Sequence, residues 1–179
     1  VVNITDNGQI GITYSGSSSG CEITNNTVHD CFYGISVTSM TLTGKNNIIS
    51  DNSENGVFLD AGTFNETYSC YYNNGDLDIV PDATSITDNP NFISSSDFHL
   101  SSSDIYGTLV AGSWPPDTIT SGTWQSKSTF SAHSPCIDSG DPASSIGDEP
   151  QPNGCNINMG CYGGTQQASK SWETSDGTY

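Results

Sequence analysis

Basic residues are almost missing from this chain. Its 179 residues include no arginine and three lysines, against 20 acidic residues, and the formal net charge at pH 7 is −17. Proteins that bind nucleic acids or anionic lipid surfaces need clustered lysine and arginine side chains. The composition therefore excludes nucleic acid as a partner. It also disfavours an enzyme that holds acidic polysaccharides through cationic side chains.

Long apolar runs are missing as well. No stretch of 18 consecutive apolar residues occurs, whereas a membrane-spanning helix needs about 20, so we predict no membrane insertion. The chain begins at Val1 with neither an initiator methionine nor a signal peptide. We therefore expect a mature or excised product.

The usual signatures of catalysis and of zinc binding are not found either. The six cysteines form no Cys-x-x-Cys pair, which argues against structural zinc. The sequence has no Gly-x-Ser-x-Gly motif of a hydrolase. An even number of cysteines together with few lysines favours an oxidising, extracellular environment. The sequence thus favours a protein outside the cell, or on its surface, that is not an enzyme.

What the sequence does contain is a repeat of 22 to 23 residues in its first third, marked by Gly11, Gly34 and Gly56. In each repeat a polar turn precedes the glycine, and an aliphatic residue follows it. This period fits coils of short strands separated by tight turns. Alternating apolar residues such as Ile35 and Val37 indicate strands. We expect the core to contain Val2, Ile4, Ile12, Cys31, Ile35 and Val57.

Stacked coils place equivalent residues about 4.8 Å apart, so Asp6, Asp30 and Asp51 form a predicted column. Carboxylates at this spacing repel one another unless they are solvated, protonated or bridged by a cation. They are solvated turn residues, a Ca²⁺ site or, as a third alternative, catalytic groups. Two further acidic clusters, at 76–88 and 138–149, present the same alternatives. No cofactor is required by the sequence, and Ca²⁺ is the only ion it suggests.

The second half carries more specific motifs: DFHL at 97–100, SPCIDSGDP at 134–142 and INMGCYGGT at 157–165. This series resembles the C-terminal end of secreted right-handed parallel β-helix proteins of bacteria and archaea, many of them large cell-surface proteins. The resemblance implies an all-β chain, a right-handed parallel β-helix (solenoid) with a loop-rich C-terminal region. Coils of 22 to 23 residues would occupy 1–80.

The same resemblance implies that 81–167 holds C-terminal coils and covering loops of the same domain. Residues 168–179 would then be a polar tail or linker, and 101–133 an excursion from the coil. In the DFHL motif, the resemblance favours a structural hydrogen-bonding role for His99.

The cysteines depart from the family pattern in one place. The family usually has Gly-Arg where Cys155 and Asn156 stand, and alanine where Cys161 stands. Two additional cysteines six residues apart indicate a local disulfide between Cys155 and Cys161, the alternative being two buried thiols. Cys21 and Cys31 are a second candidate pair, which would close one coil, and Cys136 is expected to be a buried free thiol.

Sugar chemistry is the main alternative to a structural role. A polygalacturonase-like β-helix would show four catalytic motifs. Only one of them has a match, at Asn74-Gly75-Asp76, and an Asn-Gly pair is first of all typical of a turn. A carbohydrate-binding face of Tyr14, Tyr33, Phe58 and Asp30 is still an option. Three Asn-x-Thr sequons, at Asn3, Asn25 and Asn65, are candidate glycosylation sites.

The predicted function follows from the coil. No capping helix precedes the first repeat, and an uncovered coil end offers strand edges to a partner. We therefore expect a non-enzymatic extracellular structural protein whose copies stack end to end into a filament or sheath. The alternatives are a carbohydrate-active or carbohydrate-binding module that contacts surface polysaccharide, and a fragment of a larger cell-surface adhesin.

Overall fold

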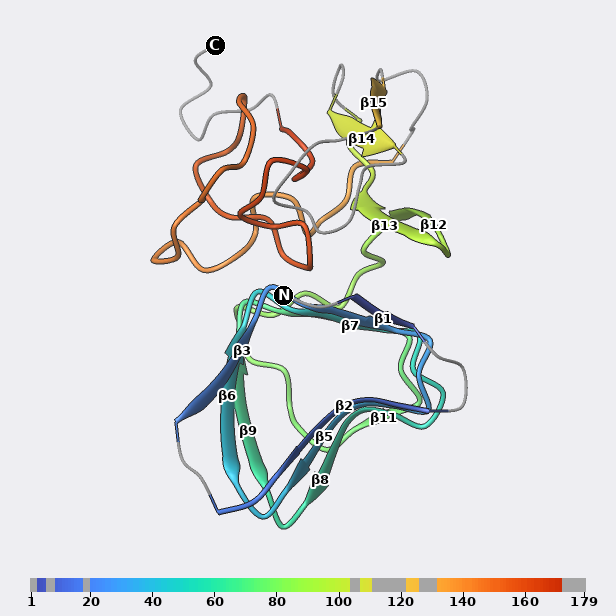
Figure 1. Cartoon of the computed structure of the whole chain (residues 1–179), viewed down its shortest axis with the longest axis vertical. Helices are drawn as coiled ribbons and strands as arrows, with labels where there is room; N and C mark the ends of the chain where they lie inside the picture. Colours follow the sequence, from blue (N-terminus) through green and yellow to red (C-terminus); the bar gives the residue numbers. More distant parts are fainter. Residues whose placement is uncertain are drawn as a thin grey trace. The chain divides into compact units, whose positions relative to one another are not determined.

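A computed structural model describes residues 3–5 (backbone only), 9–17, 20–103, 107–110, 122–125 and 132–171. These residues form strands and turns without any helix, so none of them could span a membrane as a helix. The chain divides into two compact units, Val1–Asp88 and Asn89–Tyr179, which are described one at a time (Figure 1). The all-β prediction is confirmed.

The first unit is a parallel β-helix in which each coil contributes one strand to each of three sheets (Figure 1). The sheets have the strand orders β1-β4-β7-β10, β11-β8-β5-β2 and β3-β6-β9. The strands are β1 (Asn3–Thr5), β2 (Ile10–Ser15), β3 (Cys21–Thr24), β4 (Thr27–His29), β5 (Tyr33–Thr38), β6 (Thr41–Lys45), β7 (Ile48–Ser50), β8 (Asn55–Asp60), β9 (Thr63–Thr67), β10 (Cys70–Tyr72) and β11 (Asp76–Leu77).

The register between coils follows the sequence repeat. Ile12 pairs with Ile35, and Ile35 pairs with Val57. The repeat glycines face inward, since a Cβ on Gly34 would lie 2.5 Å from the Gly56 carbonyl oxygen and 2.9 Å from the Asn52 amide. A side chain has no room at this position, which explains why glycine recurs with the period of the coil.

The core runs along the axis of the coils. Ile35, Val37, Leu42 and Val57 are fully buried, and burying each such side chain stabilises the fold by about 1.5–3 kcal/mol. The predicted core residues Cys31, Ile35 and Val57 are confirmed.

The other predicted core residues lie in the first coil. Ile12 is only half-buried, although it packs against the core cluster. Ile4 belongs to β1, whose side chains lie outside the described residues, as does the whole of Val2.

The corners of the coil are built from residues with a left-handed backbone. One corner stacks Asn25, Asn46 and Tyr68, with φ of 52°, 58° and 49°. Another stacks Asp30, Asp51 and Asn73, with φ of 55°, 56° and 50°. Asparagine and aspartate adopt this conformation more readily than other non-glycine residues, and so the polar turns of the repeat mark the corners.

Next to these corners, buried side chains form hydrogen bonds between successive coils. The Asn26 N–H donates to Asn47 Oδ1 at 2.9 Å, and the Asn47 N–H donates to Ser69 Oγ at 2.9 Å. These side chains satisfy backbone groups that the turns leave unpaired, and buried amide groups require such partners.

A second ladder has the same design. The Cys31 N–H donates to Asn52 Oδ1 at 3.0 Å, and the Asn52 Nδ2 donates to Asn74 Oδ1 at 2.8 Å. Cys31 thus occupies a ladder position without an amide of its own, as the repeat alignment predicts.

The segment after β11 returns to the coil stack. The Ile86 N–H donates to the Ser69 carbonyl, and the Tyr71 N–H donates to the Ile86 carbonyl, both at 2.8 Å. Ile86 thereby adds a single parallel bridge to β10. The first unit continues to Asp88, beyond the boundary at 80 that the sequence predicts.

The second unit shows no further parallel coils in its described residues. Its strands form two antiparallel pairs: β12 (Phe92–Ser94) with β13 (Asp97–Leu100), and β14 (Thr108–Val110) with β15 (Thr123–Gln125). Residues 132–171 consist of turns and bends. The predicted C-terminal coils are therefore not seen, because this part has dense Asp, Gly and Pro turns and no 22-residue repeat.

The predicted tail begins within packed structure. Ala168 and Ser169 are buried, and the Ser169 hydroxyl donates to the Leu100 carbonyl at 2.5 Å. The described part of the second unit is therefore packed structure up to Ser171, and 172–179 lie outside the described residues. Most of the predicted excursion at 101–133 also lies outside them.

Candidate functional site

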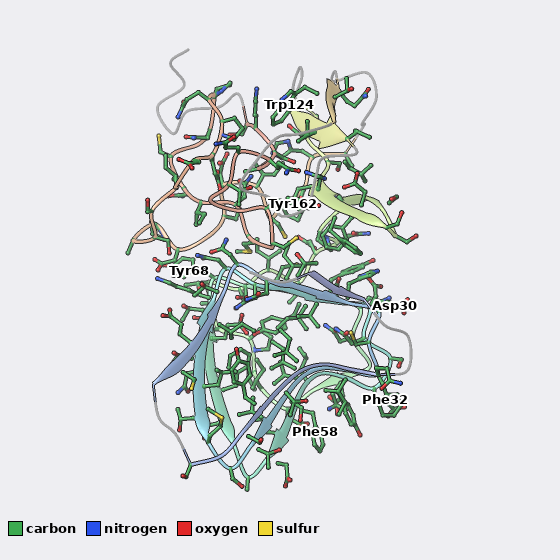
Figure 2. The ribbon with its side chains drawn as sticks, viewed as in Figure 1. Asp30, Phe32, Phe58, Tyr68, Trp124 and Tyr162 are labelled. Atoms are coloured by element: carbon green, nitrogen blue, oxygen red, sulfur yellow. The ribbon has the colours of Figure 1, made fainter. Side chains whose placement is uncertain are left out.

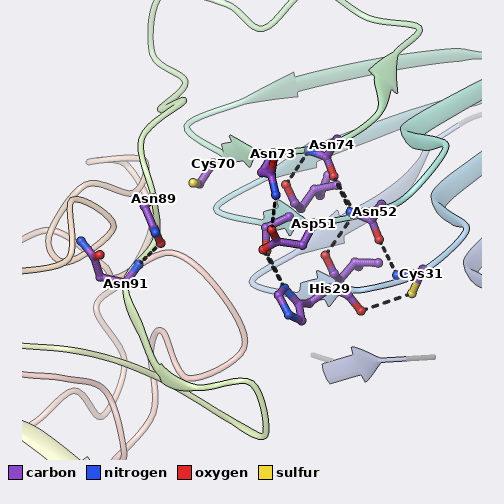
Figure 3. Close-up of polar contacts among 12 residues, drawn as sticks. His29, Cys31, Asp51, Asn52, Cys70, Asn73, Asn74, Asn89 and Asn91 are labelled. Atoms are coloured by element: carbon purple, nitrogen blue, oxygen red, sulfur yellow. Dashed lines mark hydrogen bonds and ion pairs between the residues drawn. The ribbon is translucent and has the colours of Figure 1, made fainter. Parts of the chain in front are cut away.

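The predicted aspartate column lies at one corner of the coil (Figure 3). Asp30 and Asp51 occupy equivalent left-handed positions, and Asn73 continues the column in the next coil. Asp6 lies outside the described residues. The Asn73 Nδ2 donates to Asp51 Oδ1 at 2.6 Å, while His29 Nδ1 lies 3.2 Å from Asp51 Oδ2. The Asp51 carboxylate is thus held by an amide and an imidazole.

This arrangement bears on the predicted Ca²⁺ site. Among the described residues, no three His, Cys, Asp or Glu side chains gather closely enough to hold a metal ion. His29 Nδ1 also lies 2.9 Å from the Ser50 hydroxyl, so the neighbours of Asp51 include hydrogen-bonding groups that explain its position without an ion. The Ca²⁺ column stays a prediction, because one of its three carboxylates is not described.

An aromatic cluster covers part of the outer face of sheet β11-β8-β5-β2 (Figure 2). Tyr33 and Phe58 stack with ring centroids 4.7 Å apart and planes 12° apart, and Phe32 lies 4.7 Å from Tyr33. Phe32 is 37% exposed and Ile10, which pairs with Tyr33, is 46% exposed. Exposed aromatic and aliphatic groups gathered on one face are typical of a contact surface.

The composition of this face differs from the predicted one. Tyr33 and Phe58 lie together as expected, but Tyr14 packs against the core. Its register explains the difference, since Tyr14 pairs with the fully buried Val37. Phe32 was not predicted, and its place directly before Tyr33 was the only signal for it. Asp30 is exposed at the corner that precedes β5.

A carboxyl group lies inside the third coil. Glu66 accepts hydrogen bonds from Asn47 Nδ2 at 2.7 Å, from the Ser69 hydroxyl and from the Tyr71 hydroxyl. Burial raises the pKa of Glu66, and these three donors lower it in part. Asp82 adds a smaller contribution that raises the pKa of Glu66. Glu66 ends the Asn26–Asn47 ladder, so its place is explained by the coil structure.

The histidine of the DFHL motif lies in the second unit. His99 is 1% exposed, with Nδ1 2.5 Å from Asp97 Oδ1 and Nε2 3.3 Å from Gln167 Oε1. Its ring stacks on Tyr162 at 3.7 Å. Both ring nitrogens are engaged and the side chain is buried, which fits the structural role that the sequence predicts.

All six cysteines are free thiols in the structure. Cys155 is exposed and Cys161 is buried, and Cys21 is half-buried while Cys31 is buried. The structure contains neither predicted disulfide; the Cys155–Cys161 and Cys21–Cys31 pairings stay predictions. The expected buried thiol at Cys136 is confirmed.

The sequons differ in accessibility. Asn65 is exposed on β9, whereas Asn25 is 8% exposed and its Oδ1 accepts a hydrogen bond from Asn46 Nδ2. The side chain of Asn3 lies outside the described residues. Of the two described sequons, Asn65 is the accessible one.

Comparison with known proteins identifies the first unit. The sequence profile of the family described as "Right handed beta helix region" matches residues 2–98, which is 97 of the 179 residues. No curated protein and no solved structure shows a significant match to the chain.

Proposed function

The chain belongs to the right-handed β-helix family, and we propose that within this family it is a non-enzymatic structural protein. Its copies join end to end into an extracellular filament or sheath. The observation that carries this proposal is the edge of the coil stack formed by β2 and β3, each of which is the last described strand of its sheet. On one side, β2 and β3 pair with β5 and β6 of the next coil. On the other side, their backbone groups and apolar side chains are available to a strand of another copy.

The apolar columns support such a contact. Ile12 is half-buried, whereas its column neighbours Ile35 and Val57 are fully buried between coils. Ile10, which starts β2, is 46% exposed. A further coil placed on this edge would bury both isoleucines and add a row of backbone hydrogen bonds.

Sheet β3-β6-β9 supports a head-to-tail geometry. Within the described residues, it has β3 at one edge and β9 at the other. Because all its strands are parallel, β9 of one copy can pair with β3 of the next in the same direction. A heterologous contact of this kind repeats without closing and generates a filament.

The test is a charge placed on the open edge. Ile12→Lys replaces an apolar group that packs against the core and that a further coil would bury. We expect the assembled fraction in sedimentation velocity to fall at least tenfold while far-UV circular dichroism shows that the coil is kept. Val80→Lys is the matched control, because Val80 is 93% exposed and its replacement leaves the edge unchanged. Equal sedimentation of wild type and Ile12→Lys would overturn the proposal.

A second function is favoured by the aromatic cluster of Phe32, Tyr33 and Phe58. Exposed aromatic rings stack on the apolar faces of sugars, and acidic or amide groups beside them hydrogen-bond to hydroxyls. Asn55 lies on β8, the strand that carries Phe58, and its Nδ2 donates to Asp78 Oδ1 at 3.3 Å; Asp78 directly follows the neighbouring strand β11. The cluster would thus hold a polysaccharide on the outer face of sheet β11-β8-β5-β2.

Binding of oligosaccharides distinguishes this second function from the first. On a glycan array, Phe32→Ala is expected to lose binding that Val80→Ala retains, because Val80 is exposed but lies outside the cluster. Absence of binding by the wild type, or equal binding by both variants, would remove the aromatic cluster as a sugar site.

A further inference from the structure

The turn-rich part of the second unit buries an acidic side chain. Glu149 is only 7% exposed. Its Oε1 accepts two backbone hydrogen bonds, from the N–H groups of Asn158 and Gly164, both at 2.8 Å. Its Oε2 is buried and accepts no hydrogen bond from any described residue. One half of the carboxylate is thus fixed by the backbone, and the other half lacks a partner.

A second carboxylate lies close to Glu149. The Asp138 N–H donates to Asn158 Oδ1 at 2.7 Å, so Asn158 contacts both acidic residues. Asp138 is half-buried, and its Oδ2 accepts a hydrogen bond from the Ser171 hydroxyl. Two carboxylates are therefore held within the same set of turns.

The electrostatics agree with this geometry. Burial is the main cause that raises the pKa of Glu149 to about 7; the Gly164 and Asn158 N–H groups lower this pKa in part, and the negative charge of Asp138 is a smaller raising contribution. A buried carboxylate oxygen without a partner is unfavourable, because it has lost the water that would solvate it. A positive charge beside Glu149 Oε2 would compensate for this loss.

We propose that Glu149 and Asp138 bind a Ca²⁺ ion, with Glu149 Oε2 as its principal ligand. Ca²⁺ takes six to eight oxygen ligands and accepts irregular geometry. No three His, Cys, Asp or Glu side chains converge in the described part of the chain, so such a site would have to complete its ligand set with neutral oxygens and water. A site of this kind belongs to the range of extracellular calcium modules, with a Kd of about 10⁻⁴–10⁻³ M.

The experiment is a calorimetric titration of the full chain with CaCl₂, with Glu149→Gln as the test and Asp148→Asn as the control. The glutamine side chain would keep an oxygen for the N–H groups of Asn158 and Gly164, and its new amide can donate toward Asp138. Asp148 is exposed, so the control removes the same charge next to the site. We expect at least tenfold weaker Ca²⁺ binding for Glu149→Gln and a change below twofold for Asp148→Asn.

Amide hydrogen exchange on the wild type gives a second readout that needs no variant. Ca²⁺ is expected to slow exchange at the amides of Asn158 and Gly164 at least threefold, because both donate to the bound carboxylate. Two results would overturn the proposal: equal Ca²⁺ affinity in the wild type and Glu149→Gln, or unchanged exchange at both amides. Either would mean that a proton on Glu149, rather than a cation, compensates for its burial.

Discussion

Two residues of the third coil differ from the repeat: Tyr68 at a corner and Glu66 in the interior. The left-handed corner that holds Asn25 and Asn46 continues with Tyr68, at φ 49°. A bulky residue in this region is strained by about 1–3 kcal/mol, whereas asparagine is tolerated well.

Replacing Tyr68 with asparagine should therefore stabilise the protein. The change relieves the backbone strain and restores the asparagine column, and we expect the free energy of unfolding to rise by about 1 kcal/mol. Urea unfolding followed by far-UV circular dichroism measures it. The control is Tyr72→Asn, because Tyr72 lies on strand β10 in a regular backbone. Equal effects of the two changes would contradict the strain argument.

Glu66 gives the first unit a defined pH dependence. Because burial raises its pKa above the ordinary 4.5, the folded state holds this proton more tightly than the unfolded state. The stabilising contribution of the protonated form is complete below pH 4.5 and is lost as the pH rises through the raised value.

Glu66→Gln should remove this loss. We expect the wild type to become less stable relative to Glu66→Gln as the pH rises above 4.5, and the two to be similar at lower pH. Urea unfolding of both proteins at about pH 4 and at about pH 8 tests the sign. A difference in stability that stays constant between these two conditions would show that Glu66 keeps its ordinary pKa.

In the first unit, strands of successive coils pair in a register that repeats every 22 to 23 residues. Parallel pairing alone leaves the backbone of each turn without partners, and the asparagine ladders supply them. In the second ladder, Asn52 is 1% exposed and bonds to the coils on both sides, to Cys31 and to Asn74.

Truncation of a ladder residue should therefore be costly. Asn52→Ala removes the side-chain partner of the buried Cys31 N–H and one of two donors to Asn74 Oδ1, which keeps the Asn52 N–H at 3.2 Å; each lost hydrogen bond costs about 1–3 kcal/mol. We expect a loss of about 2–4 kcal/mol in the free energy of unfolding on this basis. Asn65→Ala, on the exposed side of β9, should stay within about 0.5 kcal/mol. If Asn52→Ala also lost less than about 0.5 kcal/mol, the result would contradict a structural role for the ladder.

The repeat made the first unit predictable. Gly11, Gly34 and Gly56 occupy one column, and the core positions one residue later follow from them. Tyr14 could have been placed inside by the same alignment, because it follows Gly11 at the distance at which Val37 follows Gly34. The inward position of Glu66 was hidden, since its partners Ser69 and Tyr71 come from the following corner and strand.

The second unit was predicted less well, for a physical reason. Its described residues make antiparallel pairs and turns, which have no period that a single sequence can reveal. The motifs at 134–142 and 157–165 lie beyond the family match, which ends at residue 98, and they do not predict the contacts. The buried position of Glu149 depends on N–H groups at Asn158 and Gly164, and these come together only through the tertiary fold.

The net charge of −17 acts on the chain as a unit. Copies that stack end to end bring like charges together, and salt screens this repulsion over a Debye length of about 10 Å at 0.1 M and about 3 Å at 1 M. Assembly should therefore increase with NaCl concentration. Light scattering between about 0.02 and about 1 M NaCl, a range that spans this change in screening, measures the trend. A decrease with salt would indicate that opposite charges hold the copies together.

The most direct test of the structural role is electron microscopy of the negatively stained wild-type protein at neutral pH, beside Ile12→Lys. If the open coil edge joins copies, the wild type forms long filaments of uniform width, and Ile12→Lys yields short particles. Dispersed particles of the wild type at both low and high salt would contradict the structural role. The aromatic cluster at Phe32, Tyr33 and Phe58 would then be the surface to study first.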